Sequence, residues 1–194
     1  MNRRKLLFLA VALALVTPAQ AAEYTIDPGH SKVLFKAKHL GISTVTGRFD
    51  KFSGSYEFDP KDFKSAKVSA TIESASVNTD NERRDTHLKS ADFLEAAKYP
   101  QLTFVSKEVK NVGEGKFKVT GDMTLHGVTK PITLDAEFGG IAKDRNSERS
   151  AFNATGKINR KDFGLTWSRL TEAGGLVVGE EITIILEIEG IRKN

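Results

Sequence analysis

The side chains best able to do acid–base or metal chemistry are the four histidines, His30, His39, His87 and His126. No two of them have a metal-ligand spacing such as H-x-x-x-H or H-E-x-x-H. Histidines beside strand ends and turns usually donate or accept structural hydrogen bonds. One catalytic hypothesis remains open, an enzyme acting on a lipid-like substrate with His30, His87 or His126 as its general base.

Other kinds of catalytic chemistry lack their residues. The chain has no cysteine, which excludes a thiol nucleophile, a thiolate metal site and a disulfide scaffold. It contains no G-x-S-x-G nucleophile elbow, phosphate-binding glycine loop or dinucleotide fingerprint. We therefore predict no catalytic residue, no cofactor and no metal site.

The basic character of the chain is concentrated at its start. The 194 residues have a formal net charge of +4, and Arg3, Arg4 and Lys5 supply three of these charges. The apolar run from Leu6 to Val16 follows, and then small residues up to Ala21. This pattern predicts a secretory signal peptide over residues 1–21. The run is too short to cross a bilayer, which needs about 20 residues.

Removal of this segment leaves one predicted domain over residues 22–194 with a formal charge of +1. A chain so close to neutral lacks the basic stripe expected of a nucleic-acid-binding protein. Its length suits a single core. No later apolar segment is long enough to span a membrane, so we predict an exported, periplasmic protein without a transmembrane segment.

Strict alternation of apolar and polar residues dominates this domain and predicts half-buried antiparallel strands. The alternation slips by one residue at Asp50–Lys51, which predicts a bulge or a sharp bend. About eight strands follow from the pattern, at residues 31–37, 45–58, 66–72, 102–106, 117–125, 132–138, 152–158 and 182–188. Pattern alone is compatible with a closed barrel or with a two-layer sandwich.

One segment has helical spacing instead. Two short helices are expected, at about residues 81–88 and 91–98, with Asp80 and Ser90 as their N-caps. Pro100 ends the second helix before the next strand begins. The predicted fold class is therefore all-β, a single antiparallel domain with a short helical insert.

The inward faces of the strands combine small residues with phenylalanines. An eight-stranded barrel is just wide enough to be filled by side chains or to hold one small ligand. Small inward residues favour a partly unfilled interior, whereas glycines that mark bends would leave the core solid. A ligand in such a cavity would be mostly apolar, because the inward series contains almost no charge.

The order of several motifs resembles the YceI-like family. These motifs are DPGHS at 27–31, GRF at 47–49, FSG at 52–54, RRDTHLKSADF at 83–93, YP at 99–100, GDMTLHGVTKP at 121–131, INRKDFG at 158–164 and VGE at 178–180. The resemblance covers nearly all of residues 22–194. It implies a lipocalin-like antiparallel β-barrel in the periplasm, often a homodimer, that holds a polyisoprenoid or a related long-chain amphiphile.

Together these observations predict a binding or carrier protein for an apolar lipid, such as a quinone, a quinone precursor or a polyprenyl chain. Leu88 and Phe93 are expected to close one end of the cavity. The expected wall residues are Val33, Phe35, Phe49, Phe52, Val68, Ile72, Phe104, Leu134, Ile184 and Leu186. The alternatives are the lipid-directed enzyme and a ligand-free stress-response or interaction protein with a solid core.

Overall fold

The computed structural model describes residues 21–145 and 147–193, so the predicted signal peptide lies outside the described residues apart from Ala21. The described residues form one antiparallel sheet of eleven strands. The strands are β1 (Ala22–Ile26), β2 (Lys32–His39), β3 (Ser43–Phe49), β4 (Phe52–Asp59), β5 (Asp62–Glu73), β6 (Val77–Asn78), β7 (Gln101–Gly113), β8 (Lys116–Leu125), β9 (Val128–Asp144), β10 (Ser147–Asn159) and β11 (Val178–Arg192).

The sheet closes on itself through β11. This strand pairs with β10 along one edge, and its other edge pairs first with β2 and then with β1, where Ile26 lies opposite Gly190. β1 and β2 are thus two halves of one bent strand, and so are β3 and β4. The result is a closed eight-stranded barrel. It confirms the predicted all-β class and the antiparallel barrel that the family resemblance implies, and it excludes the sandwich that the alternation alone allowed.

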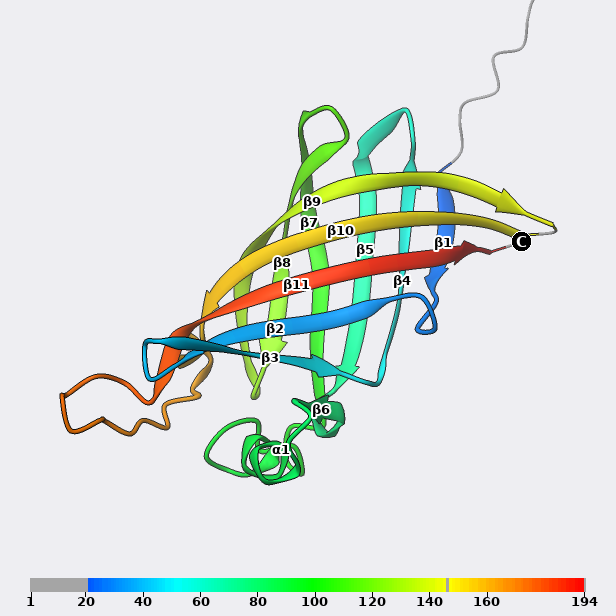
Figure 1. Cartoon of the computed structure of the whole chain (residues 1–194). Coiled ribbons are helices and arrows are strands. Elements are labelled where there is room, and N and C mark those ends of the chain that lie inside the picture. The colour runs from blue at the N-terminus through cyan, green and yellow to red at the C-terminus, as the bar shows by residue number, and fades with distance from the viewer. Residues whose placement is uncertain (1–20, 146, 194) are drawn as a thin grey trace, which may run out of the picture.

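The barrel is flattened. In Figure 1, strands β9, β10, β11, β2 and β3 cross in front of β4, β5 and β7 at a steep angle. The chain changes from one layer to the other at Asp50–Lys51, where the backbone bends between β3 and β4. The predicted phase slip therefore marks a corner of the barrel.

The insert between β6 and β7 differs from the prediction. Helix α1 (Glu82–Lys89) forms, and its N-cap is Asn81, whose side chain accepts from the backbone N–H of Arg84. The second predicted helix, at 91–98, and the second N-cap at Ser90 are wrong. Ser90 is instead the C-cap of α1, and turns follow it.

The backbone explains why no second helix forms. Glu95 has a φ of 44° in the left-handed region, which interrupts a right-handed helix. The N–H of Leu94 donates to the carbonyl of Leu88 at 3.0 Å, so the chain folds back onto α1. This reversal buries Phe93 and Leu94 against the end of the barrel.

Two groups of buried side chains lie inside the barrel. Aromatic residues around Tyr24, Tyr56 and Phe58 form one group. The other consists mainly of aliphatic residues around Val77, Leu102 and Leu125, together with Leu94 of the insert. The interior is therefore aromatic in one part and aliphatic in the part next to α1.

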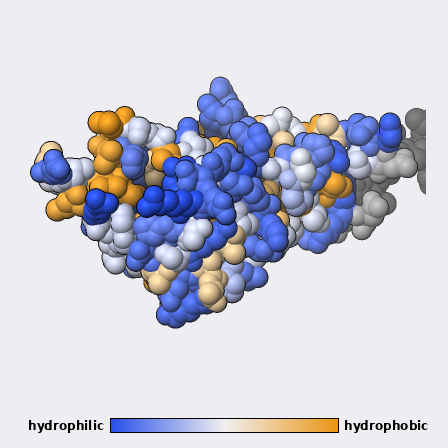
Figure 2. Space-filling view, turned by 60° about the horizontal axis from the view of Figure 1, so that its bottom comes forward, coloured by the Kyte–Doolittle hydropathy of each residue, from blue (hydrophilic) through white to orange (hydrophobic). Residues whose placement is uncertain are grey.

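The outer surface is mostly hydrophilic on the face that Figure 2 shows, with apolar side chains gathered at one end. Leu40, Ile42 and Leu170 are exposed large apolar residues of the described chain. The β2–β3 turn lies beside the loop before β11, because the N–H of Leu40 donates to the carbonyl of Val177 at 3.0 Å. Within the described residues, no helix has the length and apolar character needed to cross a membrane.

Candidate functional site

An apolar cavity of about 280 Å³ lies inside the barrel. Its lining comes from the inward faces of the strands and from the insert. All ten side chains predicted as walls border it, as do the two predicted at its end: Val33, Phe35, Phe49, Phe52, Val68, Ile72, Leu88, Phe93, Phe104, Leu134, Ile184 and Leu186. The strand alternation therefore brings all twelve to one space.

The small inward residues have two different roles. Gly47 and Gly121 provide room for phenyl rings, because a Cβ on Gly47 would lie 2.3 Å from Cζ of Phe35, and one on Gly121 would lie 2.6 Å from Cζ of Phe104. The alanines that border the cavity are Ala37, Ala66, Ala70, Ala136 and Ala154. The glycines thus let rings lie against the wall, and the short alanine side chains leave the open space.

At the aromatic group, rings in stacked and edge-on contact form the wall of the interior. The ring of Phe58 lies 5.2 Å from that of Tyr24 and 5.3 Å from those of Phe63 and Phe152. The hydroxyl of Tyr56 donates to the carbonyl of Ser150 at 2.9 Å. Burial raises the pKa of Tyr56 to about 12, so this hydroxyl stays protonated and offers no charge to a ligand.

The insert covers the aliphatic part of the cavity. Leu88, Phe93 and Leu94 line it together with Leu165. Trp167 lies on top of this group, with its ring 5.2 Å from those of both His87 and Phe93. This cluster of rings includes Phe93 of the cavity lining, and closure of the cavity end by Leu88 and Phe93 stays a prediction.

One buried charge borders the cavity and is not among the predicted wall residues. Arg160 is 2% exposed and lines the space. The signal was present, because Arg160 continues the inward series of β10 two residues after Ile158. The other charged residues of the lining, Glu57 and Lys67, pair with each other at 3.9 Å and have side chains 40% and 77% exposed.

The histidines proposed as general bases do not border the cavity. Nδ1 of His30 lies 2.9 Å from Oδ2 of Asp27 in an exposed turn, and Nε2 of His87 lies 2.7 Å from Oδ2 of Asp92. His126 occupies the β8–β9 turn, with its ring 4.5 Å from that of Tyr99. The geometry therefore does not favour catalysis by these residues on a ligand in the barrel.

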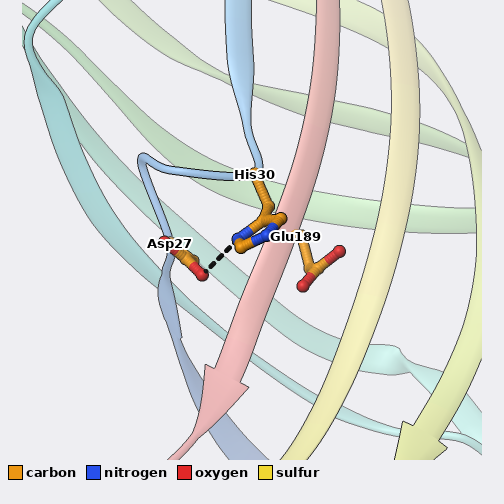
Figure 3. A group of neighbouring side chains, drawn as sticks. All are labelled: Asp27, His30 and Glu189. Atoms are coloured by element: carbon orange, nitrogen blue, oxygen red, sulfur yellow. Dashed lines mark hydrogen bonds and ion pairs between the residues drawn. The ribbon is translucent and has the colours of Figure 1, made fainter.

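Three potential metal ligands gather where β1 turns into β2. The ligand atoms of Asp27, His30 and Glu189 lie within 4.8 Å of one another (Figure 3). Nη1 of Arg149, however, donates to Oδ2 of Asp27 at 2.8 Å and to Oε1 of Glu189 at 2.5 Å. Both carboxylates are thus already bound by one guanidinium, so we interpret the group as an ion-pair network that joins the end of β1 to β10 and β11.

This network should make stability depend on acid pH. The hydrogen bond from Arg149, assisted by His30, lowers the pKa of Asp27 to about 2, against about 3.9 in an unfolded chain. Between about pH 4 and pH 2 the unfolded chain therefore binds a proton that the native protein does not. We expect the urea midpoint to fall through this window as pH decreases, and to fall less steeply in Arg149→Met.

The matched control is Lys157→Met, which removes an exposed ion pair to Glu181. It should keep the wild-type slope of stability against pH, because exposed pairs contribute little. Equal slopes in Arg149→Met and the wild type would contradict the role assigned to Asp27.

Comparisons with known proteins agree with this geometry. A family model described as the YceI-like domain matches residues 24–190. A UPF0312 protein of Vibrio parahaemolyticus is 42% identical over 190 residues, which is 95% of each chain. The crystal structure of a YceI protein of Campylobacter jejuni superposes with a TM-score of 0.70 at 42% identity, covering 81% of this chain and 90% of that one.

A more distant structure has the same fold. It is a domain of Saccharophagus degradans described as polyisoprenoid binding, with a TM-score of 0.63, 20% identity, and coverage of 88% of this chain and 98% of that chain. At this identity the likeness concerns the fold alone.

Proposed function

The chain belongs to the YceI-like domain family, and we propose that it is a periplasmic carrier that holds a polyisoprenoid or similar long-chain amphiphile inside its barrel. The observation that carries the proposal is the apolar cavity of about 280 Å³. An apolar cavity of about 150 Å³ suffices to bind benzene in another protein. The larger space here suits a longer hydrocarbon.

The energetics favour a chain over a polar ligand. Each buried methylene contributes about 0.8 kcal/mol, so a chain of modest length binds tightly without any hydrogen bond. Polar ligands would lose their hydration against phenylalanine, leucine and isoleucine side chains that offer no partner. The polyisoprenoid described for the Saccharophagus domain belongs to the same chemical class, and a quinone or quinone precursor is the finer form of the proposal.

The two alternatives receive less support. A solid core would need side chains that fill the interior, and the cavity occupies that place. A lipid-directed enzyme with His30, His87 or His126 as base would need one of them beside the cavity, and none of the three borders it.

The test is organic extraction of protein purified from its native periplasm, followed by mass spectrometry. We expect about one long-chain apolar molecule per protein molecule. Traces of phospholipid without such a species would overturn the proposal. Sequencing of the purified protein should find Ala22 at its N-terminus if export removes residues 1–21, and light scattering would test the homodimer that the family resemblance implies.

Filling the cavity should weaken binding in proportion to the volume lost. Ala154 borders the cavity from β10, and Ala154→Phe would occupy the space of about four methylenes, equivalent to about 3 kcal/mol. Affinity for a long-chain probe should fall about 100-fold. The control is Thr155→Phe on the exposed face of the same strand, and an unchanged affinity in folded Ala154→Phe would remove Ala154 from the binding wall.

A further inference from the structure

Arg160 stands at the end of an apolar series. The inward residues of β10 run Phe152, Ala154, Gly156 and Ile158, and the next residue in the same alternation is Arg160, at the start of the 3₁₀ helix Arg160–Phe163. Its side chain is buried and lines the cavity. A cation in this position destabilises the folded protein, because burial of a charge without a partner carries a large desolvation penalty.

Backbone carbonyls hold the guanidinium in place. Nε donates to the carbonyl of Gly179 at 3.0 Å, Nη1 to that of Leu165 at 2.5 Å, and Nη2 to that of Val178 at 3.3 Å. A guanidinium has five N–H groups, so one N–H on each terminal nitrogen remains beyond these three bonds. The carbonyls fix the plane of the group without neutralising its charge.

No carboxylate within the described residues forms an ion pair with Arg160. The acidic residue that acts on it is Glu180, whose Oε1 is bound by Nζ of Lys161 at 2.5 Å. Burial lowers the pKa of Arg160 from its ordinary value, but an arginine remains protonated at neutral pH. The cavity is therefore bordered by a fixed positive charge with which no carboxylate of the described residues pairs directly.

We propose that Arg160 is the head-group site of this cavity and selects an amphiphile with an anionic oxygen head, a carboxylate or a phosphate, over a neutral one. Such a head would accept from the N–H groups that remain on the two terminal nitrogens, as carboxylates and phosphates do from arginine. The head would neutralise the guanidinium while the chain fills the apolar space. The inference rests on the proposed function and narrows its ligand class.

The test compares heads on one chain length. Delipidated wild-type protein is titrated with dodecanoate, dodecyl phosphate and dodecanol at pH 8, and dissociation constants are measured by displacement of a fluorescent probe. We expect at least one of the two anions to bind 10-fold or more tightly than dodecanol. Preference for both supports a general anionic site, and preference for one of them identifies which head the site takes.

Three arginine variants test whether the charge of Arg160, and not a general change of structure, determines the preference for an anionic head. In Arg160→Gln the ratio of anion to dodecanol affinity should fall close to one, whereas Arg169→Gln, at an exposed arginine of the following loop, should keep the wild-type ratio. Arg160→Lys keeps a charge with fewer donors and should give an intermediate ratio, which provides a second measurement if Arg160→Gln does not fold.

Failure of this inference and failure of the proposed function give different results. Wild-type protein that binds dodecanol as tightly as both anions overturns the head-group site while the carrier function stands. Wild-type protein that binds none of the three probes overturns both. A ratio in folded Arg160→Gln equal to that of the wild type also overturns the site.

Discussion

Arginine in place of Phe104 is expected to abolish retention of the bound lipid, whereas arginine in place of the next residue, Val105, should leave retention unchanged. Phe104 borders the cavity, and its ring lies against Gly121. Val105 is on the opposite face of β7 and 53% exposed. The two substitutions introduce the same charge one residue apart, so they differ only in the side of the barrel wall that receives it.

The size of the effect follows from desolvation. A guanidinium inside the apolar space costs several kcal/mol unless it reaches water or a partner, and a loss of about 3 kcal/mol in binding is a factor of about 100. The dissociation constant of Phe104→Arg for the lipid should therefore rise about 100-fold or more, and the lipid extracted from this variant should fall well below the wild-type amount. Circular dichroism checks that the barrel remains. Phe104→Gln, which is polar but uncharged, provides a milder variant with a smaller loss.

The outcome that contradicts this prediction is a folded Phe104→Arg protein with full lipid content. In that case the lipid would lie outside the space that Phe104 borders. Loss of lipid in Val105→Arg as well would point to a general disturbance of β7 and not to the cavity.

The wall of the barrel could be predicted from the sequence because strand alternation is a local property. Phe104, and likewise Val33 and Leu186, are at the inward positions of an alternation that repeats every two residues. This alternation places them on the inner face whichever strand lies next to their own. The alternation could not predict closure, which came only from the family resemblance, because closure depends on Ile26 meeting Gly190, two residues far apart in the chain. The short strand β1 that makes this contact was missed for the same reason.

Two predictions from local sequence patterns were wrong or incomplete, one for the helical insert and one for the inward glycines. Residues 91–98 have helical spacing, yet the left-handed Glu95 turns the chain back onto α1. Inward glycines indicated empty space, although Gly47 and Gly121 provide room for rings. In both cases the deciding interaction is a tertiary contact that composition does not encode.

Arg160 was missed for a different reason. A charged residue two positions after Ile158 looks like the end of the strand, because inward positions are normally apolar. The three carbonyls that hold its guanidinium belong to Leu165, Val178 and Gly179. These residues lie outside β10 or at the start of β11, so the alternation of β10 cannot predict that they bind Arg160. Continuing the inward series of β10 by one more position, from Ile158 to Arg160, would have identified this residue.

The largest expected loss of stability is that of Phe58→Ala. Phe58 is 1% exposed, and its ring lies between those of Tyr24 and Phe63, with Phe138 and Phe152 edge-on. Truncation of a buried phenylalanine to alanine typically costs about 3–5 kcal/mol. We expect a loss of this size in urea unfolding, and for a domain of this length each kcal/mol lowers the melting temperature by about 2–4 °C.

The matched substitution is Phe35→Ala on the cavity wall. Phe35 is only partly buried, and its ring has one aromatic neighbour among the described residues, Phe49 at 5.7 Å. Phe35 is less buried and has fewer aromatic neighbours than Phe58, so its removal should cost clearly less than that of Phe58. Equal losses of stability at both positions in lipid-free protein would contradict this difference in packing, because a partly buried ring with one aromatic neighbour has fewer contacts to lose than a fully buried ring with five among the described residues.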